Sequence, residues 1–346
     1  MDSPRENPSH GPIQFDKRRG DRGGGRDDRA MIEPSGASPL VSVIIPVFNA
    51  EATILLALAS VQGQTYRALE ILVVDDCSAD ATAERVDQLA ADDPRLRLIR
   101  HERNQGPAAA RNSGLAAASG RYSAFLDADD EWLPDKLERQ VAALLATPRA
   151  VLCCCNAVWV RGGIAEGTVY DGCVVSNGAE AWKGMLEDVF VGTPCAVVDT
   201  AVARRLGGFD ARLRVGEDQD LWLKLAFAGE VVALPEILVR YRLSAGSYMD
   251  RRRDLSITDW LPRLLDHVEA RRPQLTSAER HRILRRIYER MGRNAYRDGP
   301  ALRAIPLLLR AIRHGAAPLA IVSSIIRTSA VAWGLKSLLG RVRSLG

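Results

Sequence analysis

The sequence of 346 residues lacks three features that would each define a class of protein. Its six cysteines include no CxxC pair, which argues against a zinc site or a disulfide framework and favours buried, reduced thiols in a cytosolic protein. No run of about 18 uncharged apolar residues occurs, so no segment has the composition of a membrane-spanning helix. The turn after the first predicted strand, PVFNAEA, contains no glycine, which excludes the G-x-G-x-x-G loop of a nicotinamide-dependent dehydrogenase.

Both ends of the chain differ in composition from its middle. Residues 1–38 are rich in Gly, Pro, Arg and Asp and have no apolar centre of the kind found in a signal peptide, so we expect a disordered tail. Residues 39–250 are expected to form the main domain and residues 251–346 a mostly helical extension. After Asp298 the chain has no Asp or Glu, while Lys and Arg residues lie among apolar clusters. Such a segment either lies on an anionic membrane surface or packs as a helical or oligomer-forming element.

Short apolar runs alternate with helical patterns from Val41 onwards. The first four predicted strands are Val41–Val47, Leu69–Asp75, Leu96–Arg100 and Tyr122–Leu126, and the helices that follow them are Ala50–Gln62, Asp80–Ala91, Pro107–Ser119 and Pro134–Ala146. This alternation predicts an α/β fold with a central, mostly parallel sheet and helices on both of its faces. Later strands are predicted at Ala150–Cys155, Ala196–Val198, Val231–Leu234 and Ile237–Tyr241, with a helix at Asp218–Ala228.

Polar residues fall where three of these strands end. The first strand leads to Pro46, Phe48 and Glu51, the second to Asp75 and Asp76, and the fourth to Asp127, Ala128, Asp129 and Asp130. Ligands of an open parallel sheet bind beyond the carboxyl ends of its strands, so these residues are candidates for one site. Each also has a simpler interpretation: the acids could cap a helix or terminate a strand, and Phe48 could be core.

A group of carboxylates at one edge would repel a phosphate unless a cation lay between them. Mg²⁺ and Mn²⁺ prefer oxygen ligands, and Mg²⁺ commonly uses one or two carboxylates together with phosphate oxygens. A bound cation would stabilise the charge of a departing diphosphate. The sequence therefore favours a site for a divalent cation and a nucleotide diphosphate, with no nucleic acid among the expected partners.

A second group of acids opens the predicted helix in GEDQDLW. Glu217 and Asp218 stand where acids favour the helix dipole, which is one interpretation of them. The other is catalytic, with one carboxylate removing the proton of an acceptor hydroxyl. Arg111, on the Ala-rich helix, is either a solvated charge or a contact to a phosphate or base.

Four segments, in order, resemble the family 2 glycosyltransferases, which are inverting enzymes of the GT-A fold. They are VSVIIPVFNAEATI, ILVVDDCSADAT, NQGPAAARNSGLAAASGRYSAFLDADDEW and GEDQDLWLKL, within Val41–Leu243. The resemblance implies a Rossmann-like GT-A sheet, a nucleotide-diphospho-sugar donor, UDP-linked in preference to thymidine or guanosine carriers, and an Mn²⁺ or Mg²⁺ cofactor. It implies a carbohydrate or lipid-linked acceptor and a role in cell-surface polysaccharide or glycolipid synthesis. The expected location is cytoplasmic, and peripheral on the inner membrane face if the basic C-terminal segment binds the membrane.

The resemblance also assigns roles to residues. Pro46, Phe48 and Glu51 correspond to the first nucleotide-contact segment, Asp76 to the acid that reads the base, with Asp75 beside it, and Arg111 to the family's ARN arginine. Asp127 and Asp129, on either side of Ala128, match the DXD acids, with Asp129 the direct metal ligand. Asp218 matches the general base, and Glu217 would position the acceptor.

One departure from the family pattern and two rival classes remain open. Many members continue the last strand into YR-x-H, whereas this chain has Ser244 in place of the histidine, which leaves a third metal ligand in doubt. A nucleotidyltransferase would also combine a nucleotide, a metal and carboxylates, but would need a basic, Gly-rich loop. A non-catalytic nucleotide-sugar-binding or membrane scaffold protein of the same fold is the second rival.

Overall fold

A computed structural model describes residues 38–243, 256–298 and 301–317. The predicted N-terminal tail lies outside these residues except for Ser38. Ser244 and the basic residues beyond Arg313 lie outside them as well. Among the described residues the six cysteines are all free thiols, four of them buried.

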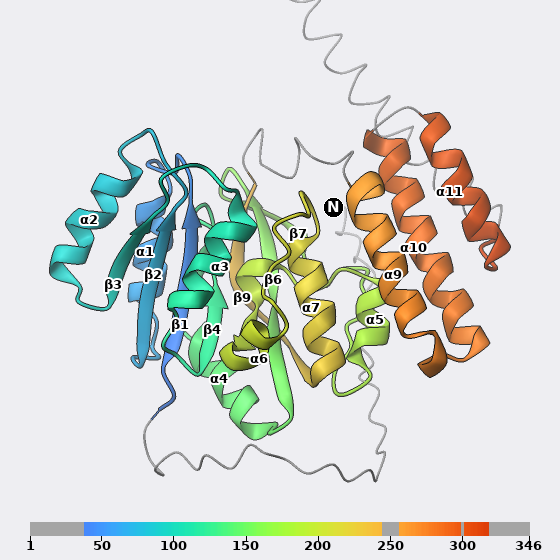
Figure 1. The fold of residues 1–346 in the computed structure, drawn as a ribbon, viewed down its shortest axis with the longest axis horizontal. Helices are drawn as coiled ribbons and strands as arrows, with labels where there is room; N and C mark the ends of the chain where they lie inside the picture. The colour runs from blue at the N-terminus through green and yellow to red at the C-terminus, as the bar shows by residue number, and fades with distance from the viewer. Residues whose placement is uncertain (1–37, 244–255, 299–300, 318–346) are drawn as a thin grey trace, which may run out of the picture. The chain divides into compact units, whose positions relative to one another are not determined.

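A nine-stranded sheet forms the centre of the described chain (Figure 1). Its order is β3-β2-β1-β4-β8-β6-β9-β5, with β7 paired to β6 off this path. The strands are β1 Val41–Val47, β2 Leu69–Asp75, β3 Leu96–Arg100, β4 Tyr122–Phe125, β5 Glu131–Trp132, β6 Ala150–Arg161, β7 Ile164–Thr168, β8 Val197–Asp199 and β9 Glu230–Arg242. The predicted α/β fold with a mostly parallel central sheet is confirmed.

The parallel half of the sheet determines where the candidate site lies. β1 lies between β2 and β4 and is parallel to both, with Ile44 opposite Leu72 on one side and Phe125 on the other. The carboxyl ends of these three strands therefore lie at one edge. In the other half, β8 runs antiparallel to β4 and β6, while β9 is parallel to β6.

Helices cover both faces of the sheet, because the side chains of β1 alternate between two apolar clusters. Ile44 belongs to the cluster shared with α3, α5, α6 and α7, and Val43 and Ile45 to the cluster shared with α1, α2 and α4. The helices are α1 Ile54–Gln62, α2 Thr82–Asp92, α3 Pro107–Ala117, α4 Lys136–Ala146, α5 Ala181–Glu187, α6 Thr200–Arg205 and α7 Glu217–Ala228.

The second half of the main domain differs most from the predicted elements. β9 is one strand of 13 residues, where two were predicted, because it continues through Pro235 beside β6 with irregular register. β6 is twice the predicted length because its far end forms a hairpin with β7. The short elements α5, α6, β5 and the 3₁₀ turn η1 Thr193–Cys195 had no periodic sequence signal.

The helices after residue 255 pack on the face of the sheet that carries α7. They are η2 Ser256–Trp260, α9 Leu261–Ala270, η3 Arg272–Gln274, α10 Ser277–Asp298 and α11 Ala301–Arg313. Leu264, Val268 and Ile283 from these helices join the same buried cluster as Leu221 and Trp222 of α7. Trp222 is thus a core side chain, in contact with Phe125 and Phe209.

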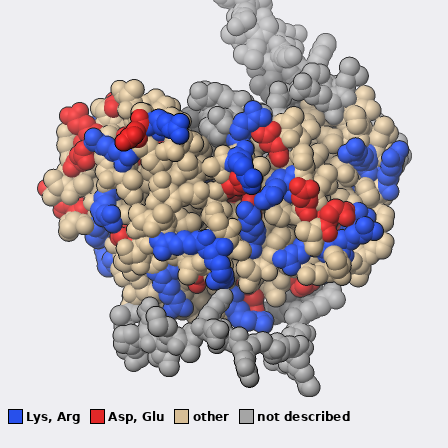
Figure 2. Space-filling model, viewed as in Figure 1, with Lys and Arg blue, Asp and Glu red and all other residues tan. Residues whose placement is uncertain are grey.

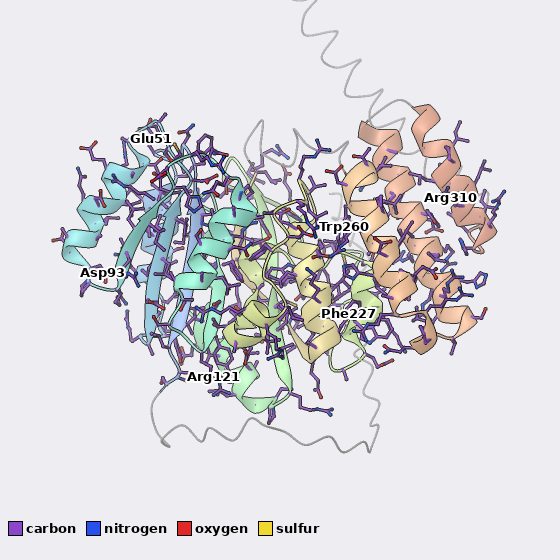
Figure 3. The ribbon with its side chains drawn as sticks, in the orientation of Figure 1. Glu51, Asp93, Arg121, Phe227, Trp260 and Arg310 are labelled. Atoms are coloured by element: carbon purple, nitrogen blue, oxygen red, sulfur yellow. The ribbon has the colours of Figure 1, made fainter. Side chains whose placement is uncertain are left out.

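Two contacts join the C-terminal helices to the first turns of α7. Asp220 is fully buried and accepts hydrogen bonds from Arg263 Nε at 2.7 Å and from His267 Nε2 at 2.8 Å, both on α9, and it pairs with Lys224. Gly216, just before α7, has a left-handed φ of 78°, and a Cβ there would come within 2.6 Å of the Trp260 ring. Figure 3 shows Trp260 beside the upper end of α7.

Removing the Asp220 charge should destabilise the protein. Burial raises the pKa of Asp220, but the hydrogen bonds from His267, Arg263 and Lys224 outweigh it and hold the pKa below the ordinary value. We expect Asp220→Asn to lower the free energy of unfolding by about 3 kcal/mol at pH 7. A folded-state pKa below the unfolded one stabilises the protein above the unfolded pKa of about 3.8, so the deficit of the variant should shrink as the pH falls below that value.

The measurement is denaturant unfolding at pH 7 and at about pH 2, with Asp266→Asn, an exposed acid on α9, as the control. The control should change stability by less than about 0.5 kcal/mol. Equal stability of Asp220→Asn and the wild type at pH 7 would contradict the inference that this network braces α7.

Candidate active site

The loops that follow β1 and β2 are joined by hydrogen bonds at the carboxyl edge of the sheet. Asn49, with a φ of 50°, accepts a hydrogen bond from the Ala79 N–H at its side-chain oxygen and donates its own N–H to Ser78 Oγ. The Glu51 carboxylate accepts the N–H of Ala81, so it is used in ordering the loop before α2 (Figure 3). Phe48 remains 51% exposed at this edge, and Pro46 is half-buried in β1.

The two acids that end β2 are buried and satisfied by main-chain donors. Asp75 accepts the N–H of Ser78 at 3.1 Å. Asp76 accepts the N–H groups of Gln105 at 2.9 Å and Gly106 at 2.7 Å, and contacts His101 Nδ1 at 2.8 Å. Asp76 thereby fixes the start of α3, and its role in reading a base remains a prediction.

Arg111 of α3 joins the acid at the end of β4 to the acid that begins α7. Its side chain is 7% exposed and donates from Nη2 to Asp127 at 2.7 Å and from Nη1 to Glu217 at 3.0 Å. Burial alone would lower the pKa of Arg111, but Asp127 and Glu217 outweigh it and raise the pKa. Arg111 is therefore a buried cation between two carboxylates and not a solvated helix charge.

The four residues after Leu126 have different environments. Asp127 is half-buried against Arg111, and Ala128 is half-buried beside it, whereas Asp129 is exposed. Local desolvation and the neighbouring Asp127 carboxylate raise the pKa of Asp129 even though the residue faces solvent. Asp130 turns inward and accepts the N–H of Arg242 at 3.0 Å, and burial together with Asp127 and Asp129 raises its pKa well above the ordinary value.

The start of α7 holds two further carboxylates. Burial and the adjacent Asp218 raise the pKa of Glu217, against the lowering effect of Arg111. Asp218 is less buried and accepts hydrogen bonds from Thr193 Oγ1 at 2.9 Å and from the N–H of Gln219 at 2.7 Å. Each carboxylate oxygen of Asp218 keeps a lone pair for a further donor such as an acceptor hydroxyl.

Several residues of this region had no signal in the sequence. Thr193 lies in a 3₁₀ turn that no periodic sequence pattern predicts. Gln219 donates a hydrogen bond from its side chain to the Val191 carbonyl at 2.8 Å, and a helical pattern does not predict this contact. Tyr241 of β9 is stacked on Trp159 with ring centroids 4.6 Å apart. Local desolvation and the nearby groups Cys195, Asp130, Asp127 and Asp218 raise the pKa of Tyr241 well above its ordinary value, although the residue is only half-buried.

The structure thus brings some candidates into direct contact and leaves others apart. Asp127, Arg111, Glu217 and Asp218 form one connected group. Asp75, Asp76 and Glu51 lie at the same edge of the sheet but make their hydrogen bonds to neighbouring loops. Asp220, although two residues from Asp218, faces α9 and belongs to the C-terminal brace.

The acid group suits a hard divalent cation in chemical type. Within the described ranges, no group of three or more His, Cys, Asp or Glu side chains is arranged to enclose a metal ion. Enclosure by the protein is not required, since Mg²⁺ is commonly held by one or two carboxylates and substrate phosphates. Desolvation first, and neighbouring carboxylates second, raise the pKa values of Asp129 and Asp130, and a nearby cation would favour their charged forms.

An acid cluster beyond the ends of the parallel strands lies where open α/β sheets bind their ligands, as the GT-A fold expected from the sequence requires. The sequence model of the family described as "Glycosyl transferase family 2" matches residues 42–166. The chain is 35% identical over 212 residues to the Escherichia coli UDP-Glc:alpha-D-GlcNAc-diphosphoundecaprenol beta-1,3-glucosyltransferase WfgD, covering 60% of this chain and 79% of that protein. It is 31% identical over 223 residues to TuaG of Bacillus subtilis, a glycosyltransferase named for teichuronic acid biosynthesis, covering 64% and 86%.

Solved structures agree on the fold. Residues 1–349 of Staphylococcus aureus TarS in complex with UDP-GlcNAc align with a TM-score of 0.61 and 20% identity, covering 84% of this chain and 83% of that one. A Pyrobaculum calidifontis mannosyltransferase, PcManGT, in complex with GDP-Man and Mn²⁺ aligns with a TM-score of 0.52 and 21% identity, covering 89% and 81%. The chain belongs to glycosyltransferase family 2 and is a glycosyltransferase.

Removing the charge of Arg111, which joins Asp127 to Glu217, should destabilise the protein. We expect Arg111→Met to lower the free energy of unfolding by about 3 kcal/mol, because it leaves the carboxylates of Asp127 and Glu217 without their buried partner. Denaturant unfolding measures the loss. Arg97→Met, an exposed arginine on β3, is the matched control and should be nearly neutral. Equal losses in the two variants would show that the bridge contributes nothing specific.

Proposed function

We propose that the chain transfers a sugar from a nucleoside-diphosphate sugar, with UDP as the carrier, to an acceptor hydroxyl during synthesis of a cell-surface polysaccharide or glycolipid. The observation that carries the proposal is the Arg111 bridge, which draws the acid after β4 and the acids of α7 into one cluster at the carboxyl edge. The names of WfgD and TuaG, and the UDP-GlcNAc in the TarS complex, support the donor class and the process.

The donor side of the site is formed by the loops after β1, β2 and β4. Phe48 offers an exposed ring for a nucleobase, and Asp76, with Pro46, Glu51 and Asp75, shapes the surrounding loops. Asp129, with Asp127, would hold Mn²⁺ or Mg²⁺. When bound, that cation supplies Lewis-acid stabilisation of the diphosphate charge. Arg111 keeps Asp127 oriented and prevents the acids of the two segments from repelling each other.

The acceptor side is formed by the start of α7. Asp218 removes the proton of the acceptor hydroxyl as the hydroxyl oxygen attacks the anomeric carbon and the bond from that carbon to the diphosphate oxygen breaks. The nucleoside diphosphate leaves with the bonding pair, and the configuration at the anomeric carbon inverts. Glu217, held by Arg111, positions the acceptor beside this base.

The proposal is tested by separating donor binding from transfer. Asp218→Asn should cut turnover about 10²- to 10⁴-fold while UDP with Mn²⁺ still raises the melting temperature, because only the base is lost. Asp129→Asn should abolish that metal-dependent shift. The readouts are release of free nucleoside diphosphate from a UDP-sugar panel and thermal denaturation. Release of pyrophosphate would indicate nucleotidyl transfer, and full turnover by Asp218→Asn would remove it as the base.

We also propose that α11 lies on an anionic membrane surface, which would bring the enzyme to a lipid-linked acceptor. Among the described helices, none combines the length and the hydropathy that crossing a bilayer requires. On α11, Ile305 and Leu309 are four residues apart and 49% and 56% exposed, while Leu307 and Leu308 are buried. Arg310 and Arg313 are exposed on the same helix, and Figure 2 shows basic side chains at this end of the molecule. Apolar residues beside arginines favour anionic lipid.

Vesicle co-sedimentation tests this surface. The paired substitution Ile305→Ser with Leu309→Ser should reduce pelleting with vesicles containing anionic phospholipid, because it removes the apolar contacts and leaves the packed side of α11 intact. Ile164→Ser, which changes an exposed residue of β7, should pellet like the wild type. Equal pelleting of all three proteins, or equal pelleting with neutral vesicles, would contradict the proposal.

A further inference from the structure

The turn η1 lies between the acids of the donor side and the base of the acceptor side, although neither group includes it. All three of its residues are buried, and Thr193 itself is 5% exposed. A buried hydroxyl needs a partner, and that of Thr193 donates to Asp218 Oδ2 at 2.9 Å. The side chain of Gln219 reaches the Val191 carbonyl at 2.8 Å, so two side-chain hydrogen bonds join this stretch to the first turn of α7.

The other side of the turn is held from the segment that carries the donor-side acids. The indole N–H of Trp132, three residues after Asp129, donates to the Pro194 carbonyl at 2.9 Å. Gln140 of α4 donates from Nε2 to the Cys195 carbonyl at 2.8 Å and to the Cys153 carbonyl at 3.1 Å. Lys136 covers the Trp132 ring, with its ammonium 3.9 Å from the centroid, so the indole has little freedom to move.

A third contact limits how the turn can shift. A Cβ on Gly192 would lie 2.0 Å from the Tyr241 hydroxyl, so the backbone here packs directly against the Tyr241 ring. Residues 191–195 are thus held by hydrogen bonds to Trp132 and Gln140 on one side and to Gln219 and Asp218 on the other. The Tyr241 ring packs against Gly192 and limits movement there as well.

We infer that Thr193 is a positioning residue for transfer: its hydroxyl holds the Asp218 carboxylate at a fixed place relative to Asp129, through the turn that Trp132 anchors. The inference rests on the proposed role of Asp218 as the base. Without the Thr193 hydroxyl the Asp218 carboxylate would keep only the Gln219 N–H on its other oxygen, and a misplacement of about 1 Å at a reacting group can cost roughly 10²-fold in rate. Thr193 contacts the base and acts on the substrate through it.

The test compares Thr193→Val, which keeps the shape and removes the hydroxyl, with Thr193→Ser, which keeps the hydroxyl. Thr193→Val should lower kcat about 100-fold with the KM for the UDP-sugar within about twofold, and Thr193→Ser should retain most of the activity. Because Thr193 acts through Asp218, adding Thr193→Val to Asp218→Asn should cause almost no further loss. Trp132→Phe, which removes the indole N–H and leaves a smaller aromatic ring, should also lower kcat, by a smaller factor. This variant provides the test if Thr193→Val does not fold.

The outcomes separate this inference from the proposed function. If Asp218→Asn is inactive but both Thr193→Val and Trp132→Phe match the wild type in kcat, the positioning role is wrong and the base assignment stands. The positioning role is also wrong if the losses of Thr193→Val and Asp218→Asn multiply, or if Thr193→Val changes KM alone. If Asp218→Asn itself retains full turnover, the proposed base is wrong before Thr193 is considered.

Discussion

The site depends on one buried cation. Arg111 neutralises Asp127 and Glu217, which are otherwise like charges brought together from the end of a strand and the start of a helix, and Arg111 and Glu217 are 106 positions apart in the chain. Without a positive charge between them these carboxylates would repel each other in a poorly solvated place, and the raised pKa of Glu217 shows how little charge the environment tolerates. The guanidinium suits this position because its donors are fixed in a plane and can serve two acceptors at once.

Four aspartates of the same local chemistry perform different tasks because their surroundings differ. Asp127 is paired with Arg111, Asp129 faces solvent with a raised pKa, and Asp130 is tied to the backbone of β9. Asp220 faces the C-terminal helices and has a lowered pKa. Asp130 and Asp220 stabilise the scaffold, Asp127 pairs with Arg111, and Asp129 is exposed, as its proposed role as a cation ligand requires.

The sequence predicted the parallel half of the sheet and its acidic edge because both follow from local patterns. Apolar runs identify β1, β2 and β4, and parallel pairing then brings Phe48, Asp76 and Asp127 to one side of the sheet. Contacts that depend on irregular backbone were not predictable in this way. Thr193 meets Asp218 only because η1 is anchored by Trp132, and β9 continues through Pro235 only because β6 lies beside it. The burial of Asp220 against α9 likewise depends on tertiary packing, which periodicity does not report.

The contact between Gly216 and Trp260 limits which C-terminal segments this enzyme could exchange with its relatives. The backbone before α7, which carries the proposed catalytic acids, accommodates an indole from beyond residue 255, and only a residue without a side chain fits there. A segment grafted in place of the C-terminal helices would therefore have to supply a flat side chain at that point and donors for Asp220, or the first turn of α7 would lose its support. The helices after residue 255 therefore support the segment that carries the proposed base and are not an interchangeable tail.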